Sequence, residues 1–90
     1  MARAGVNEFE SCHAKAESGA PEALFDLGLF YSTGTGVPVD LVAAHKWFNL
    51  AALKGNREAR QARTELAALM TTDEVAQAQR LAREWQKTHH

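Results

Sequence analysis

The sequence predicts an all-α fold, a short α/α solenoid of antiparallel helix pairs with a C-terminal capping helix. Alanine and leucine supply most of the apolar residues, and β-branched residues are sparse, which favours helix over strand. Glycines divide the chain into segments of helical length, and apolar residues recur within these segments at helical spacing. A chain of 90 residues is long enough for one small domain.

The first two of about five expected helices have recognisable ends. The first is expected over residues 8–18, with Asn7 as its N-cap and Gly19 directly after its end. The second is expected to begin at Pro21, where a missing N–H costs nothing, and to run to about Thr33. Its apolar stripe consists of Ala23, Leu24, Leu27, Phe30 and Tyr31.

A loop at residues 34–38 separates the second helix from the third, because it contains two glycines and a proline. Asp40 is expected to cap the third helix, which runs to about Lys54 and ends at Gly55. Trp47 lies on the packed side of this helix, so we expect it to be the most important core residue.

Two more helices complete the predicted fold. Asn56 caps the fourth, and its apolar positions include Ala59, Ala62, Leu66, Leu69 and Met70. Thr71 and Glu74 form a capping box at the start of the last helix. This helix is expected to turn Trp85 inward and a basic side outward, consisting of Arg80, Arg83 and Lys87.

Part of the sequence recurs 36 residues later, a period typical of stacked helix pairs. The matching residues are Ala16, Gly19, Glu22 and Ala23 in one copy and Ala52, Gly55, Glu58 and Ala59 in the next. The wider pattern consists of Gly19, Ala23, Leu27, Gly28, Tyr31, Gly34, Gly36, Val37, Asp40, Ala44, Trp47, Ala51, Ala52 and Gly55. This pattern resembles the Sel1-like repeat family, whose members are related to tetratricopeptide repeats.

The resemblance implies one full repeat at about residues 20–55, with partial repeats on both sides. The expected organisation is a flexible N-terminus over residues 1–7 and a single repeat domain over residues 8–88, with the capping helix at about residues 72–88. The second copy departs from the pattern, since Thr64 and Ala67 stand where the repeat has a glycine and a tyrosine. Such divergence is typical of terminal repeats, whose outer face meets water.

Composition argues against several classes of protein. The net charge is −1 and the basic residues do not cluster, which argues against nucleic-acid binding. No apolar run approaches the ~20 residues that span a bilayer, so membrane insertion is not expected. The N-terminal residues do not resemble a signal peptide, which favours a cytoplasmic protein, or a periplasmic or exported one if a leader is missing.

No catalytic, cofactor or metal site is expected. The Gly34–Gly36 loop lacks the preceding strand and the lysine of a phosphate-binding loop. Cys12 and His13 are adjacent on a helix and point about 100° apart, while His45 is expected among solvent-facing positions. Some cysteine-rich members of the resembled family are linked to β-lactam binding or hydrolysis, but they use paired cysteines and this chain has only Cys12.

The predicted function is therefore a non-catalytic protein–protein interaction or assembly module that binds a protein or peptide. The alternatives are a structural or self-associating subunit that stacks through its ends, and, as a minor one, a hydrolase-like activity. By resemblance to related repeats, the partner would bind a groove between the second and fourth helices, where acidic residues favour a basic or amide-rich segment. Without a partner, the same residues would simply form a solvated charged face. The candidate residues are Glu22, Asp26, Leu29, Glu58 and Glu65, with Phe48 as an exposed apolar contact.

Overall fold

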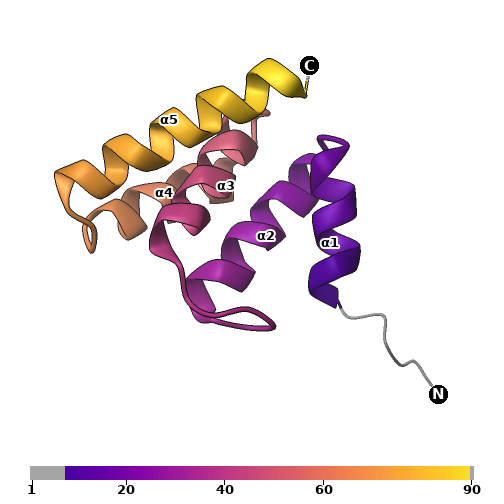
Figure 1. Ribbon diagram of the computed structural model, residues 1–90, viewed down its shortest axis with the longest axis horizontal. Coiled ribbons are helices and arrows are strands. Elements are labelled where there is room, and N and C mark those ends of the chain that lie inside the picture. Colours follow the sequence, from indigo (N-terminus) through magenta and orange to yellow (C-terminus); the bar gives the residue numbers. More distant parts are fainter. Residues whose placement is uncertain (1–7, 90) are drawn as a thin grey trace.

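The computed structural model describes residues 8–89, which form five α-helices and no strand (Figure 1). The all-α prediction is confirmed, and the helix bounds agree with the predicted ones to within a few residues. The helices are α1 (Glu8–Glu17), α2 (Pro21–Thr33), α3 (Leu41–Leu53), α4 (Arg57–Ala67) and α5 (Thr72–Thr88).

Helix α3 lies at the centre of the fold and packs against α2, α4 and α5, while α1 packs against α2 (Figure 1). In the series of packed helices α1, α2, α3 and α4, helices α1 and α4 therefore lie at opposite ends. None of the described helices is both long and apolar enough to cross a membrane.

The helix ends follow the predicted capping residues. The backbone N–H of Ala43 donates to Asp40 at 3.0 Å, and that of Ala59 donates to Asn56 at 2.8 Å. Thr71 and Glu74 form both hydrogen bonds of the capping box. Pro21 begins α2 as predicted, and the expected cap Asn7 lies outside the described residues.

Two buried clusters hold the helices together. In the larger cluster, Trp47 of α3 is 3 % exposed and meets Trp85 of α5 edge to face, with ring centroids 5.9 Å apart. The smaller cluster joins Phe48 of α3 to Leu66 of α4 and Phe25 of α2. The predicted core role of Trp47 agrees with this burial.

A glycine brings α2 unusually close to α3. A Cβ atom built on Gly28 would lie 2.5 Å from two ring carbons of Phe48, so only glycine lets the ring rest against the α2 backbone. Phe48 is consequently only 2 % exposed. The prediction that Phe48 is an exposed contact for a partner is therefore wrong.

Two other residues differ from the sequence-based expectation. His45 is 2 % exposed and lies inside the fold, because its side of α3 is covered by neighbouring helices. Leu69 is 75 % exposed because α4 ends at Ala67, so the helical stripe that would have buried it does not continue.

Glu17 connects the first and last helices. Its carboxylate accepts a hydrogen bond from Trp85 Nε1 at 3.2 Å and lies 2.7 Å from His89 Nε2. The His89 ring stacks on Trp85 with centroids 4.0 Å apart. These contacts hold the end of α1 against the end of α5.

Candidate functional site

A groove of about 720 Å³ lies between α1 and α2. Helix α1 contributes one side of it and α2 the other, because the two helices pack together and leave their outer faces open. The lining residues are Glu8, Ser11, Cys12, Lys15, Ala20, Glu22, Ala23, Asp26, Leu29, Phe30, Thr33 and Thr35.

The groove combines an apolar floor with an acidic rim. Three carboxylates, those of Glu8, Glu22 and Asp26, line it together with a single lysine, Lys15. Within residues 8–89 no salt bridge involves any of these carboxylates. Leu29 is 39 % exposed, which is a large exposure for an apolar side chain. The groove therefore offers apolar contact together with a preference for positive charge.

Cys12 is partly buried in this groove. Its Sγ donates a hydrogen bond to the carbonyl oxygen of Ala23 at 3.2 Å. Burial, and next the charge of Asp26, raise the pKa of the Cys12 thiol, although Lys15 acts in the opposite direction. A thiol that stays protonated is a poor nucleophile and a poor metal ligand.

Other chemistry-bearing groups are dispersed. Among the described residues, no three His, Cys, Asp or Glu side chains are arranged to hold a metal ion. His45 is buried, and its Nδ1 has no hydrogen-bond partner in the described part of the chain. Burial, and next the positive charge of Arg63, lower the pKa of His45 below its ordinary value of 6.5. The imidazole is therefore neutral at pH 7.

The structure brings only part of the predicted site together. Glu22, Asp26 and Leu29 line one groove, and this groove lies between α1 and α2. The position predicted for it, between the second and fourth helices, is wrong for a physical reason: the Phe48 ring fills the space between Phe25 of α2 and Leu66 of α4.

The two acidic residues predicted on the fourth helix do not contribute to the groove. Glu58 and Glu65 are exposed on α4 and are absent from the groove lining. The sequence prediction missed the contribution of α1, which supplies Glu8 and Cys12. The 36-residue repeat could have identified them, since Glu8 and Cys12 precede Ala44 and Phe48 by one period.

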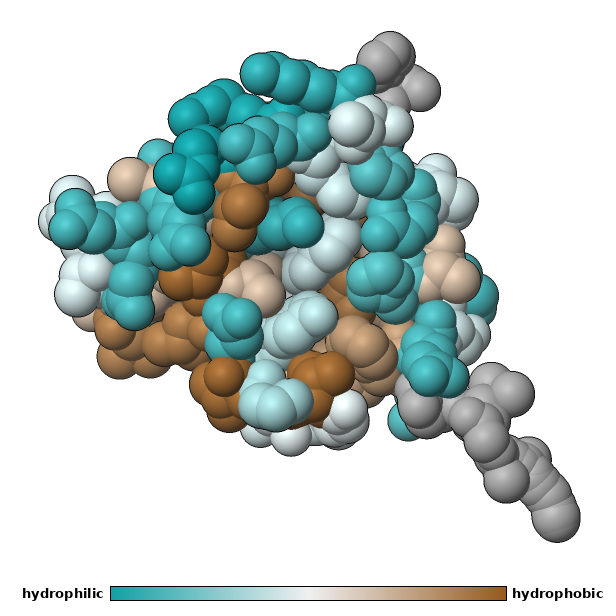
Figure 2. Space-filling view, in the orientation of Figure 1, coloured by the Kyte–Doolittle hydropathy of each residue, from teal (hydrophilic) through white to brown (hydrophobic). Residues whose placement is uncertain are grey.

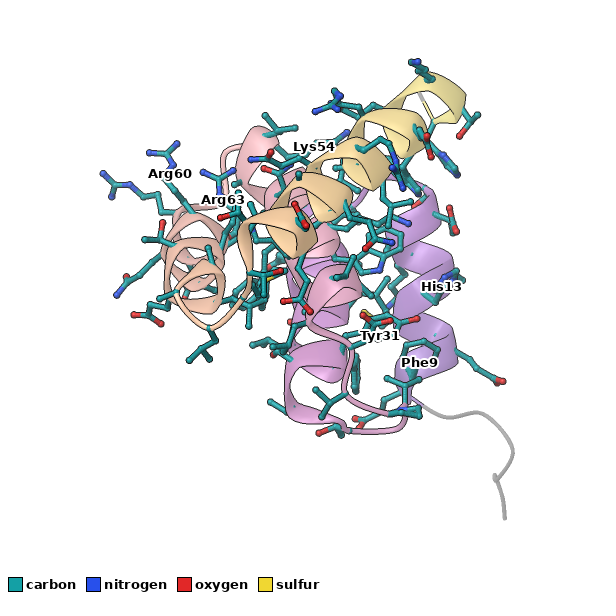
Figure 3. All side chains as sticks on the ribbon, turned by 60° about the vertical axis from the view of Figure 1, so that its left-hand side comes forward. Phe9, His13, Tyr31, Lys54, Arg60 and Arg63 are labelled. Atoms are coloured by element: carbon teal, nitrogen blue, oxygen red, sulfur yellow. The ribbon has the colours of Figure 1, made fainter. Side chains whose placement is uncertain are left out.

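The charge of the opposite end of the molecule differs from that of the groove. Arg60 and Arg63 lie on α4, on the far side of the molecule from Phe9 and His13 of α1 (Figure 3). Arg63 donates a hydrogen bond to Asn49 of α3. Helix α5 presents a hydrophilic surface along one side of the molecule (Figure 2). The apolar and acidic groove thus belongs to the α1–α2 end alone among the surfaces described here.

The fold and the period define a class, the α/α solenoids built from helical repeats. The family model described as Sel1 repeat matches residues 21–56, the segment that contains α2, α3 and the turn after α3. This segment is therefore a Sel1 repeat, as its residue pattern indicated. No curated protein matches the chain significantly. Sel1 repeat domains generally act as protein-interaction modules.

Proposed function

We propose that this protein is a non-catalytic protein-interaction module and that the α1–α2 groove receives its partner. The single observation that carries the proposal is the groove itself, an opening of about 720 Å³ with an apolar floor and three carboxylates on its rim. A surface of this kind suits a protein segment that brings apolar side chains and positive charge.

The chemistry of the groove supports binding better than catalysis. Its one potential nucleophile, Cys12, has a raised pKa and donates its proton to a backbone carbonyl group. His13, the nearest histidine in the sequence, lies within 3.7 Å of Glu17, which does not line the groove. Among the described residues that line the opening, no histidine lies beside Cys12 to act as its base, so the groove suits binding better than nucleophilic catalysis.

The proposal is tested by capture of partners from the native source with three forms of the protein. The parent is compared with the groove variant Glu22→Lys/Asp26→Lys and with a matched control, Glu58→Lys/Glu65→Lys. Both variants change the net charge equally, and all four residues are exposed, so neither should alter the melting temperature much. Circular dichroism melts check this.

We expect the groove variant to lose captured proteins that the parent and the control variant retain. Equal recovery by all three forms would contradict a partner site in this groove. Selective loss in the control variant would instead place the partner on α4.

A further inference from the structure

The α1–α2 groove has an equivalent surface one repeat later in the chain, on α3 and α4. That surface is covered by α2 within this same fold. Helix α2 packs on α3, where Phe25 and Gly28 contact the Phe48 ring, and Phe25 also packs against the buried cluster that includes Leu66 of α4. The surface under α2 includes Ala44, Phe48, Ala62 and Leu66. Subtracting the 36-residue period gives Glu8, Cys12, Asp26 and Phe30, and all of these line the open groove.

The two surfaces are therefore lined at equivalent repeat positions and differ in chemistry. No described helix lies over α1 and α2 in the way that α2 lies over α3 and α4. At two positions, an alanine that α2 covers is replaced in the open groove by a carboxylate, Glu8 for Ala44 and Asp26 for Ala62. A helix seated in the open groove would thus meet negative charge where α2 meets methyl groups.

We propose that the occupant of the α1–α2 groove is a basic amphipathic helix of a partner protein, seated in the orientation that α2 adopts over α3 and α4. This inference rests on the proposed function and specifies its partner. The helix places a small residue against Cys12, as Gly28 meets Phe48, and positive side chains toward Glu8 and Asp26. Burying a carboxylate is unfavourable unless a cation accompanies it, so the charge of the occupant is specified by the groove.

A second copy of the chain fits this chemistry poorly. The outer face of α4 carries Arg57 and Arg60, but its other exposed residues are polar, and among the described residues the exposed large hydrophobic side chains are scattered. These side chains are Leu29, Val39, Leu53 and Leu69. Among the described residues these four side chains come from α2, the loop before α3, the end of α3 and the turn after α4, so they do not form one apolar helix face.

The first test uses two synthetic helices derived from α2 (Pro21–Thr33). Each carries Asp26→Lys, with the new lysine joined to the side chain of Glu22 by a lactam bridge. The bridge stabilises the helix and removes both charges on the side that would face away from the groove. One peptide carries lysine and the other glutamate in place of Phe25 and Tyr31, the side chains that α2 packs against the α3–α4 groove.

We expect the lysine peptide to bind at least about tenfold more tightly than the glutamate peptide. Its lysines would face the carboxylates of Glu8 and Asp26, whereas glutamates in the same places would be repelled by them. The same preference should disappear for the protein variant Glu8→Lys/Asp26→Lys and persist for Glu58→Lys/Glu65→Lys. Equal binding of the two peptides would overturn the proposed charge of the occupant.

The second test uses Cys12 as a reporter of orientation. The lysine peptide is prepared with Gly28→Cys or with Leu29→Cys, each activated as a mixed disulfide with thiopyridine. The small deprotonated fraction of Cys12 attacks the peptide sulfur, a peptide–Cys12 disulfide forms, and thiopyridone leaves with the electron pair. Both peptides react with the same Cys12 thiol, so its raised pKa slows both reactions and leaves their comparison unaffected. Neighbouring residues on a helix point about 100° apart, so only the first peptide should place its sulfur near Cys12.

We expect the first peptide to release thiopyridone at least about tenfold faster than the second. Equal rates would overturn the α2-like orientation. Self-association of the protein that is lost in Glu8→Lys/Asp26→Lys would make a second copy the occupant and would also overturn the proposal. These outcomes can be told apart from failure of the proposed function. In that case the parent, the groove variant and the control variant would capture native partners equally.

Discussion

Gly28→Ala tests whether the close contact between α2 and α3 specifies the packing of the repeat. The added methyl carbon would lie 2.5 Å from Cδ1 and Cε1 of Phe48, whereas ordinary contact begins at 3.4 Å, so the ring must move by roughly 1 Å. The ring has little room, because it is 2 % exposed and its centroid lies 5.6 Å from that of Phe25.

The expected loss of stability follows from two opposing contributions. Overpacking a well-filled core costs about 1–3 kcal/mol. Replacing glycine by alanine within a helix contributes about 0.8–1 kcal/mol of stability. The net effect is a loss of about 1 kcal/mol, which lowers the melting temperature of a domain of this size by roughly 4–8 °C.

A double-mutant cycle separates the two contributions. In a Phe48→Leu background the ring carbons are gone, so Gly28→Ala should raise the free energy of unfolding by about 1 kcal/mol instead of lowering it. Urea unfolding of the parent, both single variants and the double variant measures the change of sign. If Gly28→Ala stabilises both backgrounds equally, the close contact with Phe48 does not constrain the fold.

Three further changes test the core, the link between the ends of α1 and α5, and the buried histidine. Trp47→Ala removes a side chain that is 3 % exposed and should cost about 3–5 kcal/mol, which would unfold most of the domain; a thermal melt within a degree or two of the parent would contradict its core role. Glu17→Ala removes the acceptor of Trp85 Nε1 and should cost about 1 kcal/mol, with faster amide exchange at the end of α5 and little change in α4; unchanged exchange at the end of α5 would show that this contact does not hold α1 and α5 together. His45 has a lowered pKa in the fold, so below about pH 6.5 the unfolded state binds more protons and the free energy of unfolding decreases as pH falls. His45→Leu should make this part of the pH dependence smaller in urea titrations at pH 5 and pH 7, and an unchanged slope would assign it to other groups.

The α1–α2 groove links the stability of the repeat to its proposed binding role. In the buried copy of this surface, alanines at the positions of Ala44 and Ala62 allow α2 to pack without a charged partner. In the open copy, Glu8 and Asp26 are exposed to water and contribute little to folding. The same repeat position thus serves packing in one copy and is available for recognition in the other.

The sequence by itself determined the helices and the capping residues at which most of them begin. Caps such as Asp40, Asn56 and Thr71 act through hydrogen bonds to residues three positions away, so their effect can be predicted from local spacing. The family pattern was also local, and the Sel1 repeat model matches the segment that the pattern indicated. Local chemistry is sufficient for such features because each helix turn depends only on its neighbours in sequence.

Only the tertiary structure decided which faces of the helices are covered. Phe48 and His45 looked available on α3, yet both are buried, since α2 approaches closely at Gly28 and neighbouring helices cover the remaining face. The predicted groove between α2 and α4 is filled by Phe48, and a groove lies between α1 and α2 instead. Burial and grooves depend on contacts between residues far apart in the chain, and the period of the sequence does not state which helix faces pack together.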